Sequence, residues 1–574
     1  MYDPKATENL HDVFDQPIAR QIWASKYRYQ SQGRIVDVTV EDTWNRVATG
    51  LSQIEAAADQ SRVKAQFYDA MAGFKLIPAG RILAGCGTSR NVTLSNTFVM
   101  RTIPDSVAGI MDTIKDAALT MQMGGGIGFD FSTLRPEGEF VAGLDCPAAG
   151  PLAAMDICDA VCRMLVTGMG RGAMMATLRC DHPDIESFVM AKAQRTRLRN
   201  FNLSVMITDR FMAAVHKGED WDLVWNGRIV RQVRATDLWN RIMAQTYAAA
   251  EPGVLFIDRI NAANPLNYLE TIAATNSCAE QPLPPNGTCP LASINLSRLV
   301  SAPFTPEARF DLGELRRLSG VAVRLLDNTI DASRYALAEQ ARQAQAQRRI
   351  GVGVTGVADA ITMLGARYGS SKAVFLIGSW MQTIQNEAYR ASALLAAERG
   401  PFPMYIEARH LAQPSVQALD ADVRAEVDRH GLRNGTLTTI APTGTISMFA
   451  GNVSSGIEPI FSTSYLRAIT NPDGTKSLDR VIDYAVWRHD AIFGSGLPLP
   501  EAFVTASDLT PSDHIRMQAA AQKWVDSGIS KTVNCPEDIA FDAFKDIYLE
   551  AYEAGCKGCT TYRPNAITGS VLSV

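Results

Sequence analysis

The hydrophobic pattern divides the chain into two parts. In the first part, apolar residues recur at helical spacing over Glu41–Asp59 and Arg62–Phe74, and Pro78-Ala79-Gly80 marks a turn. We therefore predict a helical N-terminal region over residues 1–90 that caps the rest of the protein.

From Asn91 onward, short runs rich in β-branched residues alternate with longer helical patterns. The predicted strands are Val92–Met100, Leu198–Ile207, Gly253–Ile257 and Thr436–Ile440, and the predicted helices are Ser106–Met123, Leu315–Tyr335 and Ser379–Arg399. This alternation is typical of an α/β unit in which helices cover buried strands. Since no repeat or long linker interrupts it, we expect one body over residues 91–574.

Composition and charge narrow the class of protein. The chain has 574 residues, of which 47% are hydrophobic and 20% charged, as in a large globular enzyme. Its formal net charge of -5 gives no cationic surplus for nucleic acid or an anionic membrane. We find no signal segment and no run of roughly 18 apolar residues, so we expect a cytoplasmic protein. The ten cysteines are too sparse for a disulfide framework and are expected to be free thiols.

Two familiar motifs carry little weight here. The stretch Gly351-Val-Gly353-Val-Thr-Gly356 matches a dinucleotide fingerprint, but helix follows where a second strand ending in an acid is needed. We therefore predict a tight strand-to-helix turn, and a dinucleotide-binding site is the alternative. A single C-x-x-C, Cys556 to Cys559, has no second pair to complete a zinc site. Two core cysteines are the favoured interpretation, and a redox pair is the alternative.

Two further segments are candidates for ligand binding. Pro442-Thr443-Gly444-Thr445 with Ser447 follows an apolar run, where hydroxyls and free amides suit either a phosphate or an ordinary helix cap. The run Gly124-Gly125-Gly126 has more glycine than a helix end requires. Close passage of a ligand and a flexible turn are both open explanations of these glycines.

The loop from Asn276 to Cys289 is the strongest candidate for chemistry. It reads NSCAEQPLPPNGTC, and its prolines remove backbone freedom, so it can hold Asn276, Cys278 and Glu280 in fixed relation. Alternation in an extended segment would point these three side chains the same way. The segment therefore predicts a rigid site that joins a thiol, a carboxylate and an amide.

With these segments, the sequence resembles the class II, adenosylcobalamin-dependent ribonucleotide reductases. The resemblance rests on that loop and on six further segments: Leu94–Val99, Gly124–Pro136, Arg171–Met175, Asp181–Ile185, Ala441–Glu458 and Gly558–Asn565. It implies a ten-stranded α/β barrel of two five-stranded halves with a central finger loop, acting as a homodimer. It also implies thiyl-radical reduction of a ribonucleoside di- or triphosphate to the 2′-deoxyribonucleotide, which serves DNA synthesis.

The resemblance implies a role for each candidate residue. Cys278 would carry the thiyl radical at the finger tip, Glu280 would act as base on the 3′-hydroxyl, and Asn276 would hydrogen-bond the sugar hydroxyls. The substrate would contact Ser95, Gly124, Gly125, Gly126, Ala441, Pro442, Thr443, Gly444, Thr445 and Ser447. A deoxynucleotide effector would bind near Asp156, Arg171 and Met174 at the dimer interface.

The chain departs from the family pattern at the electron supply. Family members usually carry a cysteine where this chain has Thr97, and that cysteine forms a disulfide with the one matching Cys289. A threonine has no thiol and cannot form this disulfide. The chain also ends at Val574, before the cysteine-bearing tail of longer members. A natural variant and an engineered replacement are both open explanations of Thr97.

Three functions are consistent with these departures. The first is a reductase supplied by an external thiol reductant or a partner chain. The second is a paralogue that uses the same C3′ radical for non-reductive nucleotide chemistry. The third is a non-catalytic nucleotide- or cobalamin-binding regulator, which the retention of Cys278, Glu280 and Asn276 disfavours.

Overall fold

A computed structural model gives the fold of this chain. It describes residues 13–565 except 142, 144, 168, 169, 194, 195 and 471–475, and it leaves undescribed the side chains of residues 166, 167, 170, 171, 467–470 and 476–479. Within the part of the chain that is described, we find no helix long and apolar enough to cross a membrane.

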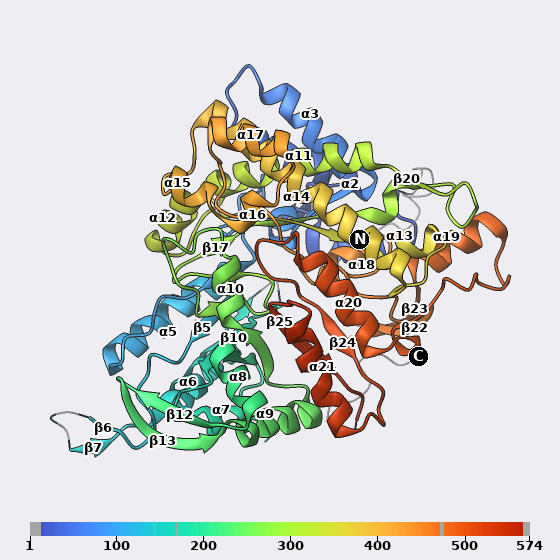
Figure 1. The fold of residues 1–574 in the computed structure, drawn as a ribbon. Helices are drawn as coiled ribbons and strands as arrows, with labels where there is room; N and C mark the ends of the chain where they lie inside the picture. The colour runs from blue at the N-terminus through green and yellow to red at the C-terminus, as the bar shows by residue number, and fades with distance from the viewer. Residues whose placement is uncertain are drawn as a thin grey trace.

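The N-terminal region is helical, as predicted. Its helices are α1 (Pro17–Ile22), α2 (Val40–Ser52), α3 (Gln60–Met71) and α4 (Gly80–Gly85). Thr39 and Asp42 form a capping box that starts α2. The apolar faces of α2 and α3 contribute Leu51 and Phe67 to a core shared with α11 (Leu312–Ala332), so these two helices pack on the body beside α11 (Figure 1).

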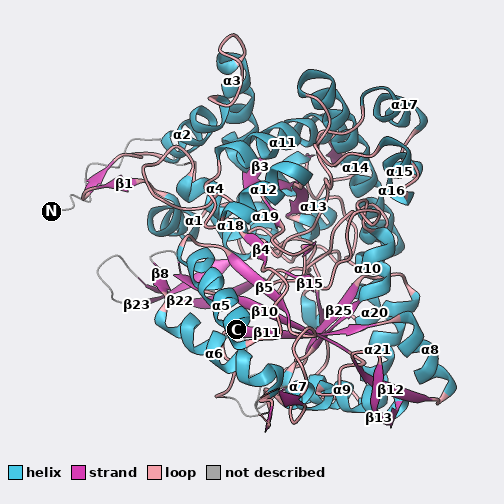
Figure 2. Cartoon of the chain, turned by 90° about the vertical axis from the view of Figure 1, so that its left-hand side faces the viewer, coloured by secondary structure: helices cyan, strands magenta, loops and turns pink. Residues whose placement is uncertain are grey.

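One half of the body is a set of five parallel strands. In pairing order they are β4 (Thr97–Val99), β5 (Gly126–Asp130), β10 (Met174–Arg179), β11 (Phe201–Ile207) and β14 (Gly253–Phe256). Figure 2 shows β4, β5, β10 and β11 in the middle of the molecule, with α5 (Val107–Gln122) and α6 (Gly150–Met164) beside them. Further helices around this half are α7 (Ile185–Met190), α8 (Asp209–Lys217), α9 (Ala235–Ala249) and α10 (Ile257–Ala263).

The other half is a second parallel set. It runs from β18 (Leu291–Asn295) through β21 (Gly351–Thr355), the segment 438–440 and the segment 529–534 that contains β24 (Thr532–Asn534), to β25 (Gly558–Tyr562). Its helices include α11, α12 (Ala338–Gln347), α13 (Val357–Met363), α14 (Ser371–Arg399), α17 (Ala421–His430), α19 (Tyr484–Phe493), α20 (Pro511–Gln522) and α21 (Phe541–Glu553).

The two halves are joined by antiparallel pairs at both ends. β14 pairs with β25, and β17 (Thr288–Cys289) pairs with β4. Only Pro290 separates β17 from β18. The order of ten strand segments therefore returns to its starting point, which agrees with the predicted arrangement of two five-stranded halves.

Local predictions differ from the structure mainly at strand ends. Residues 436–440 form single bridges to Val352 and Ile529 rather than a regular strand, and the first predicted strand is confined to Thr97–Val99. The glycine fingerprint is a strand-to-helix turn, as predicted: β21 ends at Thr355, and Gly356 adopts a left-handed φ of 68° before α13.

Candidate active site

The cysteine-bearing loop is a hairpin that projects between the two halves. β15 (Ala274–Thr275) pairs with β16 (Pro282–Leu283), and the Gln281 N–H donates to Asn276 Oδ1 at 2.9 Å across the tip. Ala279 has a φ of 66°, so the tip is a turn. The prediction of an extended segment is wrong here, because a turn rather than alternation brings its side chains together.

Backbone contacts hold this finger in place. A Cβ added to Gly128 of β5 would lie 1.8 Å from the Thr275 carbonyl oxygen, so the hairpin passes β5 at a distance that only glycine permits. On the other side, the Glu280 carbonyl accepts from Gly528 N–H at 2.9 Å and from Thr439 Oγ1 at 2.8 Å. Both halves therefore fix the position of the tip.

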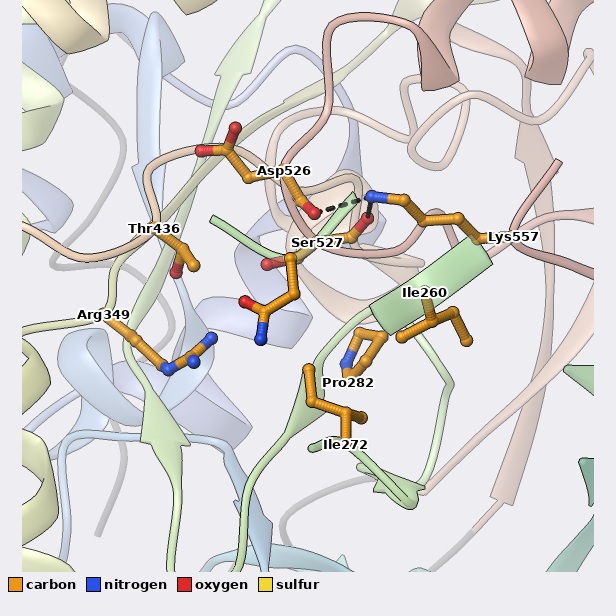
Figure 3. A pocket seen from close by; sticks show the side chains of 9 residues that line it. Ile260, Ile272, Pro282, Arg349, Thr436, Asp526, Ser527 and Lys557 are labelled. Carbon is orange, nitrogen blue, oxygen red and sulfur yellow. Dashed lines mark hydrogen bonds between the residues drawn. The ribbon is translucent and has the colours of Figure 1, made fainter. Parts of the chain in front are cut away.

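A buried lysine supports the segment behind the finger. Lys557 Nζ donates to the carbonyls of Val525, Asp526 and Ser527 at 3.0, 2.6 and 2.8 Å. Figure 3 shows it at the edge of a cavity of about 10 Å³, which has room for a single water molecule. The segment that it holds leads directly into Gly528. Lys557 is therefore linked to the carbonyl of Glu280 through the backbone.

The finger tip opens onto a cavity of about 990 Å³, large enough for a nucleotide. The structure brings together in its wall most of the predicted site residues, namely Thr97, Gly124, Gly125, Gly126, Asn276, Cys278, Glu280, Ala441, Pro442, Thr443, Gly444 and Thr445. These residues come from both halves of the body and from the finger between them.

The thiol of Cys278 is held in its neutral form. Its accessible surface faces the cavity, while the surrounding protein and the nearby Glu280 raise its pKa to about 12. A nucleophilic cysteine requires the opposite shift, toward the thiolate. A protonated S–H group is instead suited to giving or taking a hydrogen atom.

The carboxyl of Glu280 is poised to exchange a proton. Burial raises its pKa to about 7, and the side chain of Asn276 partly opposes this shift. Glu280 is only 4% exposed, and its Oε2 has no hydrogen-bond partner among the described residues. A buried carboxyl oxygen without a partner is costly, so a ligand group is expected to satisfy it.

Some predicted residues lie behind the cavity wall. Ser95 hydrogen-bonds Thr288 at 2.7 Å, Cys289 is fully buried, and Ser447 donates to the Gly444 carbonyl at 3.2 Å. None of the three lines the cavity. The side chain of Thr443 does face it, and its hydroxyl accepts from Gly456 N–H at 2.6 Å and lies 3.0 Å from the Thr355 hydroxyl.

Two of the three predicted effector residues can be placed in the described part of the chain. Asp156 lies on α6 and forms an ion pair with Arg197 at 2.6 Å, whereas Met174 is fully buried in β10. The side chain of Arg171 lies outside the described residues.

The other thiols do not reach the cavity wall. Cys556 and Cys559 are buried in a core shared with Phe544 and Tyr548 of α21, which agrees with their interpretation as core cysteines. The described residues contain no group of three or more His, Cys, Asp or Glu side chains arranged to hold a metal ion.

Sequence reasoning missed the contribution of the N-terminal region. Lys26, Arg28, Arg81 and Arg90 all line the cavity, as does Asn96, whose Oδ1 has no partner among the described residues. No local motif marks the four cationic residues, because their common position depends on how the helical region packs on the barrel.

Comparison with known proteins gives matches along nearly the whole chain. Residues 95–562 match the family described as ribonucleotide reductase, barrel domain, and residues 13–91 match its all-alpha domain. A vitamin B12-dependent ribonucleoside-diphosphate reductase of Mycobacterium tuberculosis is 38% identical over 95% of this chain and 78% of its own. One of Thermoplasma acidophilum is 32% identical over 97% and 72%. A vitamin B12-dependent ribonucleotide reductase of Streptomyces clavuligerus is 26% identical over 85% and 58%.

Proposed function

Because this chain belongs to the ribonucleotide reductase family, we propose that its cavity reduces ribonucleoside diphosphates to 2′-deoxyribonucleotides with adenosylcobalamin. The observation that carries this proposal is the finger tip. A neutral thiol and a carboxyl with a pKa of about 7 face the same nucleotide-sized cavity from a rigid turn.

The chemistry assigned to the tip needs both groups in these states. Cys278 takes the hydrogen atom from C3′ of the ribose as a thiyl radical, which forms the S–H bond and leaves a carbon radical. Glu280 Oε2 accepts the 3′-hydroxyl proton and passes it to the 2′-oxygen, which leaves as water. Asn276, which is 2% exposed in the same wall, hydrogen-bonds the sugar hydroxyls. Proton transfer is reversible because the pKa of Glu280 lies near neutrality.

The residues of the cavity mouth fit a corrinoid. Met121, Leu165 and the 70% exposed Met164 give it an apolar wall, and Gly172 beside them leaves no room for a side chain, since an added Cβ would lie 2.8 Å from Cys162 Sγ. No histidine lines this cavity among the described residues, so the described lining would hold the corrinoid without an imidazole ligand. When bound, adenosylcobalamin supplies the radical by homolysis of its cobalt–carbon bond.

Completing the reduction requires two electrons and two protons. Thr97 supplies neither, so we propose an external dithiol that is oxidised to a disulfide as the product forms. A cytoplasmic location, where thiols stay reduced, suits the ten free cysteines. Homodimer formation and regulation by a deoxynucleotide effector belong to the same proposal.

Spectroscopy and product analysis test this function together. The protein mixed with adenosylcobalamin, a ribonucleoside diphosphate and a dithiol should give a coupled cobalt(II)–thiyl signal by electron paramagnetic resonance, together with a 2′-deoxynucleotide. Cys278→Ser should abolish both, whereas Cys146→Ser, at an exposed cysteine outside the cavity, should change neither. A signal that survives Cys278→Ser overturns the radical assignment.

Thr97 is also the observation that favours a second candidate function. A paralogue that uses the same radical without net reduction has no need of a redox pair. In the experiment above it gives the signal and a modified sugar other than the 2′-deoxynucleotide. A nucleotide recovered unchanged without a signal supports a non-catalytic regulator.

A further inference from the structure

Four cationic side chains of the N-terminal region line one wall of the active-site cavity. They are Lys26, Arg28, Arg81 and Arg90. Among the described residues, none of them forms an ion pair with a carboxylate, and Glu280 is the one carboxyl group in the described lining. Because burial favours the neutral form of Glu280, the cavity carries a strong positive charge.

Arg81 differs from the other two arginines in having no hydrogen-bond or ion-pair partner among the described residues. Arg28 stacks 5.0 Å from the Trp23 ring and donates to the Asp37 carbonyl at 2.9 Å. Arg90 lies 5.5 Å from the Tyr29 ring and donates to the Ala84 carbonyl at 3.2 Å. The guanidinium of Arg81 has no hydrogen bond or ion pair to any described residue.

The surroundings of Arg81 disfavour a free charge. It lies in the first turn of α4 and is only partly exposed, and desolvation lowers its pKa despite the nearby Tyr27. Its donors face the cavity without a partner among the described residues, so an anion bound there could accept from them and would favour the charged form of the guanidinium. The finding therefore points to a ligand rather than to a structural ion pair.

The opposite side of Arg81 is built from glycine. A Cβ added to Gly124 would lie 3.1 Å from Arg81 Cζ, and the φ of Gly124 is +100°. A side chain at position 124 would crowd the guanidinium and strain the backbone. The glycine run thus leaves the arginine fork accessible from within the cavity.

We propose that Arg81 is an anion subsite that binds the phosphoryl oxygens of the substrate diphosphate. The planar guanidinium matches two phosphoryl oxygens at once, and Lys26, Arg28 and Arg90 add long-range attraction. The backbone of Thr443–Thr445 faces the same cavity and would share the phosphate. This assignment rests on the proposed function, since it names the group by which that substrate is held.

Binding measured without turnover tests the subsite. Calorimetry measures the Kd of two ligands, a ribonucleoside 5′-diphosphate and the corresponding ribonucleoside. Each is titrated into the full chain and into the variants Arg81→Gln, Arg81→Lys and Arg34→Gln. Arg34 is an exposed arginine outside the cavity and serves as the charge-matched control. We expect Arg81→Gln to weaken the diphosphate by about 10- to 100-fold and the ribonucleoside by less than about 2-fold. Arg81→Lys should restore part of the loss, and Arg34→Gln should change neither Kd.

The outcomes separate this subsite from the proposed function. The subsite is overturned if Arg81→Gln weakens the binding of both ligands equally, or if it weakens the binding of neither. Adenosylcobalamin and adenosylcobinamide, which lacks the phosphodiester, are titrated in parallel. If Arg81→Gln weakens the binding of adenosylcobalamin but not of adenosylcobinamide, Arg81 binds the phosphate of the cofactor and its assignment to the substrate is wrong.

If the unaltered chain binds no ribonucleoside diphosphate, the proposed function fails. If it binds one and Arg81→Gln binds it equally well, only the subsite fails.

Discussion

Thr97 and Cys289 lie directly opposite one another in the antiparallel pair of β4 and β17, and Thr97 Oγ1 donates to the Cys289 carbonyl at 2.8 Å. Residues facing each other in such a pair place their side chains on one face of the sheet with Cα atoms about 4.5–5.5 Å apart. That spacing falls within the range of a disulfide. The position of Thr97 is therefore competent for a redox pair that its hydroxyl cannot form.

We expect Thr97→Cys to create a disulfide with Cys289 after mild oxidation. The two thiols are buried together, so no large backbone movement is needed. Intact mass and thiol titration should show the loss of two thiols, and 2′-deoxynucleotide formation with dithiol should rise at least about 10-fold, equivalent to ~1.4 kcal/mol in the barrier. The double variant Thr97→Cys/Cys289→Ser should lose both effects. No disulfide in the single variant contradicts the inferred geometry.

Local sequence was sufficient to identify the finger. A proline-rich loop with an amide, a thiol and a carboxyl within five residues predicted a rigid site, and the structure places Asn276, Cys278 and Glu280 in one cavity wall. The reason given for their convergence was wrong, because the left-handed Ala279 forms a turn that a pattern of alternation cannot indicate.

Contacts between residues far apart in the chain could not be predicted from the sequence. Lys557 lies 277 positions after Glu280, and Arg81 lies 43 positions before Gly124. Neither pair belongs to a motif, and each becomes meaningful only when the pairing order of the strands and the packing of the N-terminal helices are known. The strand order itself followed from family resemblance rather than from periodicity.

The unfolding free energy should depend on pH through Glu280. Burial in the folded chain raises its pKa from the ordinary value of 4.5 to about 7, so between these values the folded chain keeps a proton that the unfolded chain loses. The contribution of Glu280 to the free energy of unfolding is therefore fully present below pH 4.5, and it falls by about 3 kcal/mol as the pH rises to 7.

Denaturant unfolding at pH 5 and pH 8 measures this dependence. Glu280→Gln should reduce the difference between the two pH values by that amount, and Glu501→Gln, at an exposed site, should leave it unchanged. In the unaltered enzyme, kcat/KM should rise with an apparent pKa near 7 as the base form appears. An identical pH dependence in both variants refutes the role of burial at Glu280.

Gly128→Ala should displace the finger. Its new Cβ would lie 1.8 Å from the Thr275 carbonyl oxygen, a backbone atom that cannot rotate away. We expect a loss of about 3 kcal/mol in unfolding free energy. We also expect a fall of about 100-fold in kcat, since small misplacements of reacting groups are costly. Gly378→Ala in α14 is the control, because its nearest atom is 3.9 Å away, and it should stabilise by up to ~1 kcal/mol.

Lys557→Met should weaken both the fold and the placement of Glu280. The substitution keeps an unbranched side chain but leaves three buried carbonyls without their donor, which we expect to cost about 3 kcal/mol. Those carbonyls belong to the three residues before Gly528, whose N–H donates to the Glu280 carbonyl at 2.9 Å. A shift of that segment would move Glu280, the proposed proton acceptor, without touching the side of the cavity that we propose binds phosphate.

Kinetics at a temperature where Lys557→Met remains folded separate the two effects. We expect kcat to fall by about 10- to 100-fold while the Kd of the ribonucleoside diphosphate changes by less than about 2-fold, because only the reacting end of the site is displaced. Lys523→Met, at an exposed lysine that ends α20, should behave like the unaltered chain. An unchanged kcat alongside reduced stability would assign Lys557 to the fold alone, and the backbone link from the lysine to the finger would then carry no part of the catalytic geometry.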